Sequence, residues 1–136
     1  AATAALHLGL EIPDSRFEDF TIVGAPQLIA DNACTEFFVL GPAVPESWRE
    51  IDLAAHSAAL TINGTVVAEG IGANVLGDPR IALAWLANDR ILHGAPLLAG
   101  EIITTGTCIV PAAIAPGDDV LADFGALGRV SLKFSE

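Results

Sequence analysis

Two carboxylates, Glu11 and Asp14, stand in the segment LEIPDSR, where an apolar stretch gives way to polar residues. Functional side chains are often carried where such a strand ends. Hard divalent cations such as Mg²⁺ prefer carboxylate oxygens and keep several waters when the protein supplies few ligands. On these residues alone, a turn or an ion pair is the more ordinary role. The nearby Arg16 suits an ion pair with Asp14 or a substrate carboxylate.

Two further pairs have side chains that suit an oxygen-rich small molecule. Asn32, after Asp31, offers both a donor and an acceptor, which would orient a keto-enol fragment. Gly106 would let the backbone approach a ligand closely, and Thr107 adds an uncharged hydroxyl donor. Neither pair is specific by itself, because Asp-Asn is also an ordinary turn pair.

The elements that must position these residues are mostly strands. The Ala- and Leu-rich residues 1–10 predict the end of a helix that stops at Gly9. Asn63-Gly64 between two apolar runs predicts a β-hairpin, and Asp78-Pro79 predicts a helix ending near His93. Further strands are predicted at residues 101–105, 119–124 and 128–134. The pattern therefore indicates a β-rich α+β fold with one main helix, as a single domain over residues 1–136.

The charge of the chain limits its partners. It has 136 residues, with 17 acidic and 6 basic side chains and a formal net charge of -11. This charge disfavours nucleic acid and anionic membrane surfaces as partners. It would also repel an acidic substrate, unless a cation reverses the local field, so a metal ion is expected.

The remaining reactive residues give no catalytic motif. Cys34 and Cys108 are too few for a disulfide framework, so we expect buried free thiols and a reducing, cytoplasmic location. His7, His56 and His93 do not cluster in the sequence, and no apolar run is long enough to span a bilayer. The catalytic acid or base is not identifiable.

Four segments carry a resemblance to a known family: GLEIPDSRFEDF, LIADNACTEFFVLG, GTVVAEGIGANVLGDP and the long C-terminal run ALAWLANDRILHGAPLLAGEIITTGTCIVPAAIAPGDDVLADFGALGRVSLKF. In this order they resemble the C-terminal half of the 2-keto-4-pentenoate hydratase and 2-oxo-enoate decarboxylase group of the fumarylacetoacetate hydrolase superfamily. Family members are about twice as long, and the other half includes a Glu-x-Glu pair that supplies metal ligands. Residues 1–136 would then be the C-terminal catalytic half.

The resemblance implies a mixed β-roll fold and a metal-dependent lyase. Such an enzyme hydrates a 2-keto-4-pentenoate-type 2-oxo-enoate in aromatic-compound catabolism, with Mg²⁺ or Mn²⁺ as cofactor. It implies that Glu11 is a metal ligand, and that Asp31, Asn32, Gly106 and Thr107 bind substrate. The remaining ligands and the proton-transfer group would come from a complementary polypeptide or from other copies in a homo-oligomer.

Two alternatives remain open. One is a non-catalytic partner or scaffold subunit on the same fold, because one carboxylate is a poor magnesium site by itself. The other is a related decarboxylase or C–C hydrolase. Thr35-Glu36 bears on both alternatives, because the family has small residues there and the charged Glu36 would narrow the pocket or repel an acidic substrate.

Overall fold

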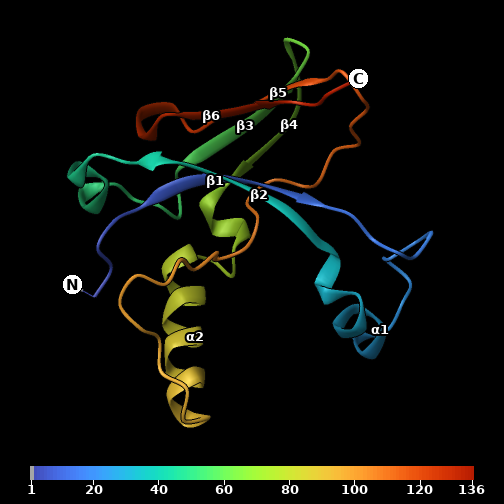
Figure 1. Ribbon diagram of the computed structural model, residues 1–136. Coiled ribbons are helices and arrows are strands. Elements are labelled where there is room, and N and C mark those ends of the chain that lie inside the picture. The colour runs from blue at the N-terminus through green and yellow to red at the C-terminus, as the bar shows by residue number, and fades with distance from the viewer. Residues whose placement is uncertain (1) are drawn as a thin grey trace.

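A two-stranded antiparallel ribbon crosses the molecule in the computed structural model, which describes residues 2–136 (Figure 1). It consists of β1 (His7–Pro13) and β2 (Thr35–Ala43). The helix predicted for residues 1–10 is therefore wrong over the described residues, because residues 2–6 form no helix and β1 follows; Ala1 lies outside the described residues. The side chains of Leu6, Leu8 and Leu10 alternate toward the core, so pairing with β2 overrides the local helical preference.

The second sheet is antiparallel and has four strands in the order β4-β3-β5-β6. It contains β3 (Ser57–Ile62), β4 (Thr65–Ile71), β5 (Asp119–Asp123) and β6 (Arg129–Lys133). The tight turn between β3 and β4 places Asn63 at φ 50° and Gly64 at φ 80°. Since this left-handed geometry suits Asn-Gly, the predicted hairpin is confirmed, and so is the closing hairpin of β5 and β6.

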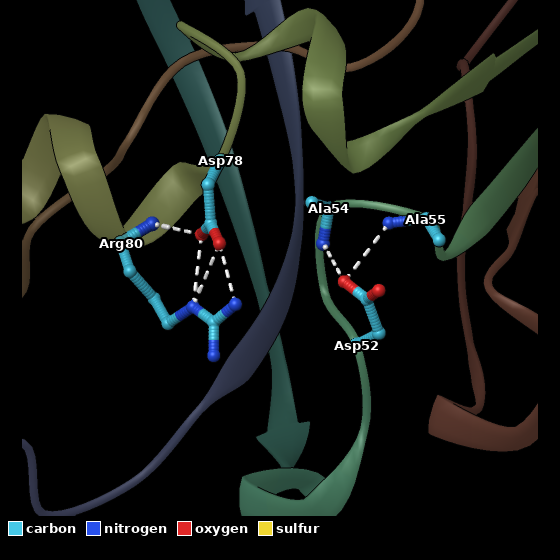
Figure 2. Close-up of polar contacts among 5 residues, drawn as sticks. All are labelled: Asp52, Ala54, Ala55, Asp78 and Arg80. Atoms are coloured by element: carbon cyan, nitrogen blue, oxygen red, sulfur yellow. Dashed lines mark hydrogen bonds and ion pairs between the residues drawn. The ribbon is translucent and has the colours of Figure 1, made fainter.

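The main helix, α2 (Pro79–Leu92), confirms the prediction from Asp78-Pro79. The Asp78 carboxylate accepts the backbone N–H of Arg80 at 2.8 Å and also binds the Arg80 guanidinium (Figure 2). In the loop before β3, Asp52 accepts the backbone N–H groups of Ala54 and Ala55. These two carboxylates hold the start of α2 and the entry to β3.

The other helical segments are short and were not predicted. They are α1 (Ala25–Ala30) and the four 3₁₀ turns Asn32–Cys34, Glu46–Glu50, Gly72–Asn74 and Gly125–Leu127. Across residues 2–136, none of the helices has the length and apolar character that crossing a membrane requires.

The chain between α2 and β5 contains no regular element over residues 95–118 and runs back beside α2 (Figure 1). The strand predicted at residues 101–105 is therefore wrong. The segment has the β-branched residues that are typical of a strand, but no described strand pairs with it, and Ile102 is left 66% exposed. A strand needs a partner as well as a pattern.

A small apolar core joins the ribbon to the four-stranded sheet. Its buried members come from β1, β5, β6 and the loops between them: Leu8, Val44, Trp48, Leu53, Ala122, Leu127 and Val130. Many large apolar side chains outside this core stay exposed, among them Trp85 of α2 at 63%. The core thus fixes the ribbon on the sheet, while α2 presents apolar surface.

Candidate functional site

A groove of about 1350 Å³ separates β1 from the returning C-terminal segment. Two long stretches of the chain line it: residues 2–13, which include β1, and residues 96–114. Four residues spaced one helical turn apart on α2 also line it: Pro79, Leu83, Ala87 and Ile91. The rest of the lining includes residues of β2 and of the four-stranded sheet. The groove is mainly apolar, and most of its polar groups lie on residues 2–13 and 96–114.

Glu11 lies in this groove. It is exposed on β1, opposite Phe38 of β2. Its carboxylate is the right kind of ligand for a hard divalent cation. Within residues 2–136, however, no three His, Cys, Asp or Glu side chains come together as a metal site. The role of Glu11 as a metal ligand therefore stays a prediction, because no cluster of three such side chains within residues 2–136 accompanies it.

Gly106 and Thr107 line the same groove, within residues 96–114. The Thr107 hydroxyl donates to the Ile109 carbonyl at 2.7 Å and accepts the Ile109 N–H at 3.2 Å. Gly106 has φ 107°, a backbone conformation that favours glycine. The pair thus forms a tight local turn, and a ligand would share the hydroxyl with this turn.

Two residues that the sequence reasoning missed hold this turn in place. Asn74 donates through its side-chain amide to the Cys108 carbonyl at 2.8 Å. Gly70 packs directly against the same carbonyl, since a Cβ at Gly70 would lie 1.9 Å from the oxygen. Gly70 in the strand run TVVAEG was a usable signal, because a glycine within a strand often marks a close backbone approach.

Asp31 is the buried charged residue of residues 2–136, at 3% exposure. Its carboxylate accepts the Ser15 hydroxyl at 2.6 Å and pairs with the Arg16 guanidinium at 2.6 Å. The Ser15 hydrogen bond, with help from Arg16, lowers the pKa of the Asp31 carboxyl. The sequence suggested an ion pair between Arg16 and Asp14. In the structure Arg16 pairs with Asp31 instead.

Asn32 is exposed and lies beside the groove rather than in its lining. Ser15, which donates to the adjacent Asp31, and Cys34, two residues further along the chain, do line the groove. The structure therefore brings Glu11, Gly106 and Thr107 to one groove, while Asn32 lies next to it and Asp31 is enclosed by its own contacts.

The groove carries no fixed positive charge among the described residues that line it. Its carboxylates are Glu11 and Glu101, and neither lysine nor arginine contributes to the lining. Its histidines are engaged by carbonyl oxygens: the His7 Nδ1 lies 2.8 Å from the Gly41 carbonyl, and the His56 Nε2 lies 2.6 Å from the Phe124 carbonyl. An anionic ligand would need a cation from elsewhere.

The two cysteines are free thiols, as expected. Cys34 is buried and Cys108 is half-buried. Burial raises the pKa of the Cys108 thiol, which makes it a weaker nucleophile at neutral pH.

The ribbon, sheet and groove belong to a known class of protein. The family described as fumarylacetoacetate (FAA) hydrolase, C-terminal, matches residues 15–134, so the chain belongs to this family. Among curated relatives, the 2-keto-4-pentenoate hydratase of Paraburkholderia phymatum is 38% identical over 135 residues, which is 99% of this chain and 51% of the relative. A 4-oxalocrotonate decarboxylase of Pseudomonas putida is 35% identical over 92% of this chain and 47% of its own length.

Solved structures agree with these relatives. The 4-oxalocrotonate decarboxylase of Pseudomonas putida in complex with magnesium and adipate superposes with a TM-score of 0.82 at 36% identity. The match covers 94% of this chain and 48% of that protein. The same enzyme with calcium and acetate gives a TM-score of 0.81. The chain thus spans about half the length of the proteins that it resembles, and their divalent ions support a metal in this class of site.

Proposed function

We propose that this chain is the C-terminal catalytic half of a divalent-metal-dependent lyase that hydrates a 2-keto-4-pentenoate-type 2-oxo-enoate. The observation that carries the proposal is that Glu11, Gly106 and Thr107 line one groove, although they come from distant parts of the chain. The identity with named hydratases over 99% of the chain supports the same reaction class. Residues 1–136 would act as one domain of the mixed β-roll in the complete protein.

In this proposal Glu11 contributes one ligand to Mg²⁺ or Mn²⁺. A bound divalent ion supplies Lewis-acid polarisation of a 2-oxo group. Gly106 and Thr107 bind the substrate, and Asn32, next to the groove, orients it. The absence of Lys and Arg from the lining of this groove supports this division of roles, because its own residues would not hold a carboxylate without added positive charge.

The remaining metal ligands and the proton-transfer group are assigned to a complementary polypeptide or to other copies in a homo-oligomer. Two observations support a partner. Glu11 is the one carboxylate that residues 2–13 contribute to the groove, and α2 has exposed apolar side chains. The cytoplasm remains the expected location, on the basis of two free thiols.

Native mass spectrometry of the purified assembly tests the partner first. A companion polypeptide or a defined homo-oligomer would support the proposal, whereas a stable monomer would contradict this part of it. The assembly is then assayed with a 2-hydroxy-2,4-dienoate and Mg²⁺, with and without chelator.

Glu11→Gln tests the metal ligand, and Glu69→Gln is the matched control, since Glu69 is an exposed glutamate on β4 outside the groove. Glu11→Gln should abolish Mg²⁺-dependent turnover while the control retains it. Paramagnetic broadening by Mn²⁺ gives a second readout, since resonances near Glu11 should broaden in the wild type and not in Glu11→Gln. Equal turnover in both variants would refute the assignment of Glu11.

Two alternatives are distinguished by the same experiments. A non-catalytic scaffold is favoured by the missing three-ligand cluster among residues 2–136, and it predicts an assembly that turns over no 2-oxo-enoate. A decarboxylase is favoured by the similarity to 4-oxalocrotonate decarboxylase, and it predicts release of CO₂ from a 2-oxo-enedioate.

A further inference from the structure

Residues of the same chain contact both oxygens of the Asp31 carboxylate. One oxygen accepts the Ser15 hydroxyl at 2.6 Å, and the other faces the Arg16 Nε at 2.6 Å and the Arg16 backbone N–H at 3.3 Å. The side chain is only 1% exposed, so a small molecule in the groove would not reach these oxygens without displacing a partner. Both oxygens of the Asp31 carboxylate are thus used for contacts within the chain, which suits a structural role better than ligand binding.

The three residues that follow have an unusual backbone. Asn32 has φ 53°, Ala33 has φ 53° and Cys34 has φ 61°. Left-handed φ values are unfavourable for residues with a Cβ, and asparagine tolerates them better than alanine or cysteine. Three in succession without a glycine persist only where the surroundings impose them.

Hydrogen bonds on both sides of Asp31 impose this turn. The Asp31 N–H donates to the Gln27 carbonyl at 2.9 Å, and the Cys34 N–H donates to the Asp31 carbonyl at 3.1 Å. The Cys34 carbonyl accepts the Asp14 N–H at 2.9 Å. The left-handed turn is thus clamped between the end of α1 and the segment that follows β1.

We propose that Asp31 is a positioning residue rather than a substrate contact: its pairing with Ser15 and Arg16 fixes the left-handed turn at Asn32–Cys34 and so sets the Asn32 side chain beside the groove. The inference rests on the proposed function only for the task given to Asn32. The same clamp ties the end of β1, which carries Glu11, to the start of β2, where Pro13 pairs with Thr35. Asp31 therefore fixes Asn32 relative to Glu11.

Nuclear magnetic resonance of the chain tests the proposal without turnover or metal. The variants are Asp31→Asn, Ser15→Ala and Arg16→Gln; the last keeps the protein folded, since the Arg16 side chain is 73% exposed. We expect the Cα shifts and the HN–Hα couplings of residues 32–34 to lose their left-handed values, while those of the β3–β4 hairpin stay unchanged. The matched control is Asp123→Asn, which removes a carboxylate paired with Arg129 in the other sheet and should leave residues 32–34 unaltered.

Left-handed values that persist in all three variants, even with a lower melting temperature, would overturn the proposal, because Asp31 would then only stabilise the fold. A second measurement uses the active assembly. If Asp31 acts through Asn32, Asp31→Asn and Asn32→Ala should each lower kcat/KM by a similar factor, and the double variant should lose no more than either. Independent, multiplying losses would contradict a role through Asn32. An assembly without turnover would refute the proposed function and leave the resonance result standing.

Discussion

Gly70 lies against the carbonyl oxygen of Cys108, and a Cβ on Gly70 would come within 1.9 Å of it. The contact joins β4 to the segment that carries Gly106 and Thr107. Backbone atoms form both sides of the contact, so no side-chain rotation relieves a clash.

We therefore expect Gly70→Ala to push residues 106–109 away from β4 and to cost about 1–3 kcal/mol of folding free energy, as overpacking usually does. Urea unfolding measures the cost, and the Thr107 amide resonance reports the displacement. Gly24→Ala is the comparison: its Cβ would meet only the flexible Gln27 side chain at 3.0 Å and Pro26 at 3.7 Å, so its cost is limited to the N-cap position of the short helix α1. If Gly70→Ala were as stable as Gly24→Ala, the Cys108 carbonyl would be able to move away from β4 at little cost, which would contradict this prediction.

Ala33 is exposed and has φ 53°. Replacing Ala33 with glycine removes the Cβ that makes the left-handed conformation unfavourable, so the folded state is stabilised. The greater conformational freedom of glycine in the unfolded chain offsets part of this stabilisation. Ala33→Gly should raise the free energy of unfolding by about 0.5–1 kcal/mol. Thermal denaturation measures the change. Ala84→Gly, on the exposed face of α2, should lower stability by a similar amount; a loss at both positions would contradict left-handed strain at Ala33.

Asp31 should make the fold sensitive to acid. Its pKa is lower in the folded chain than in the unfolded one, because of Ser15 and then Arg16. The stabilisation is therefore complete above the unfolded value of about 3.9 and is lost as pH falls through the folded pKa. Asp19 and Asp78 also have lowered pKa values and contribute in the same direction. Acid unfolding of Asp31→Asn against the wild type isolates the Asp31 share: the variant curve should be shallower below about pH 4, and parallel curves would argue against it.

The two tryptophans differ in exposure, which gives a direct probe of the partner. Trp85 on α2 is 63% exposed, whereas Trp48 in the core is 8% exposed. In a Trp48→Phe background, Trp85 fluorescence should shift to the blue and resist acrylamide when the complementary polypeptide or another copy binds. The substitution removes no side-chain hydrogen bond, because the buried Trp48 Nε1 has no partner within residues 2–136; its cost comes from the smaller ring in the core and the lost contact with Arg49 at 4.4 Å. Unchanged quenching in the assembled protein would place the interface elsewhere.

Local signals in the sequence predicted the elements that depend on neighbouring residues. The Asn63-Gly64 turn and the Asp78 cap act within a few residues, so hairpin and helix were both predictable. The β1 strand was missed because Ala and Leu favour a helix, while its true determinant is pairing with Thr35–Ala43. The alternation of Leu6, Leu8 and Leu10 was the usable sign.

The candidate site was predictable by residue type but not by contact. Glu11 and Thr107 were chosen for their chemistry, and both lie in the groove. Asp31 was chosen in the same way. Its partners Ser15 and Arg16, however, precede it by 16 and 15 residues, which is too far for a local sequence pattern to show the contact. Which carboxylate is enclosed and which one faces a groove depends on tertiary packing that one sequence does not report.

Two long stretches that line the groove, residues 2–13 and 96–114, come from distant parts of the chain. The hairpins β3–β4 and β5–β6 close short loops and are expected to fold early, whereas the groove brings together residues that are separated by more than half of the chain. We expect it to form last, in the slowest folding phase, after the sheet is complete. Until then the apolar residues of the groove are exposed to solvent. We therefore expect the folding intermediate to aggregate through these residues at high protein concentration.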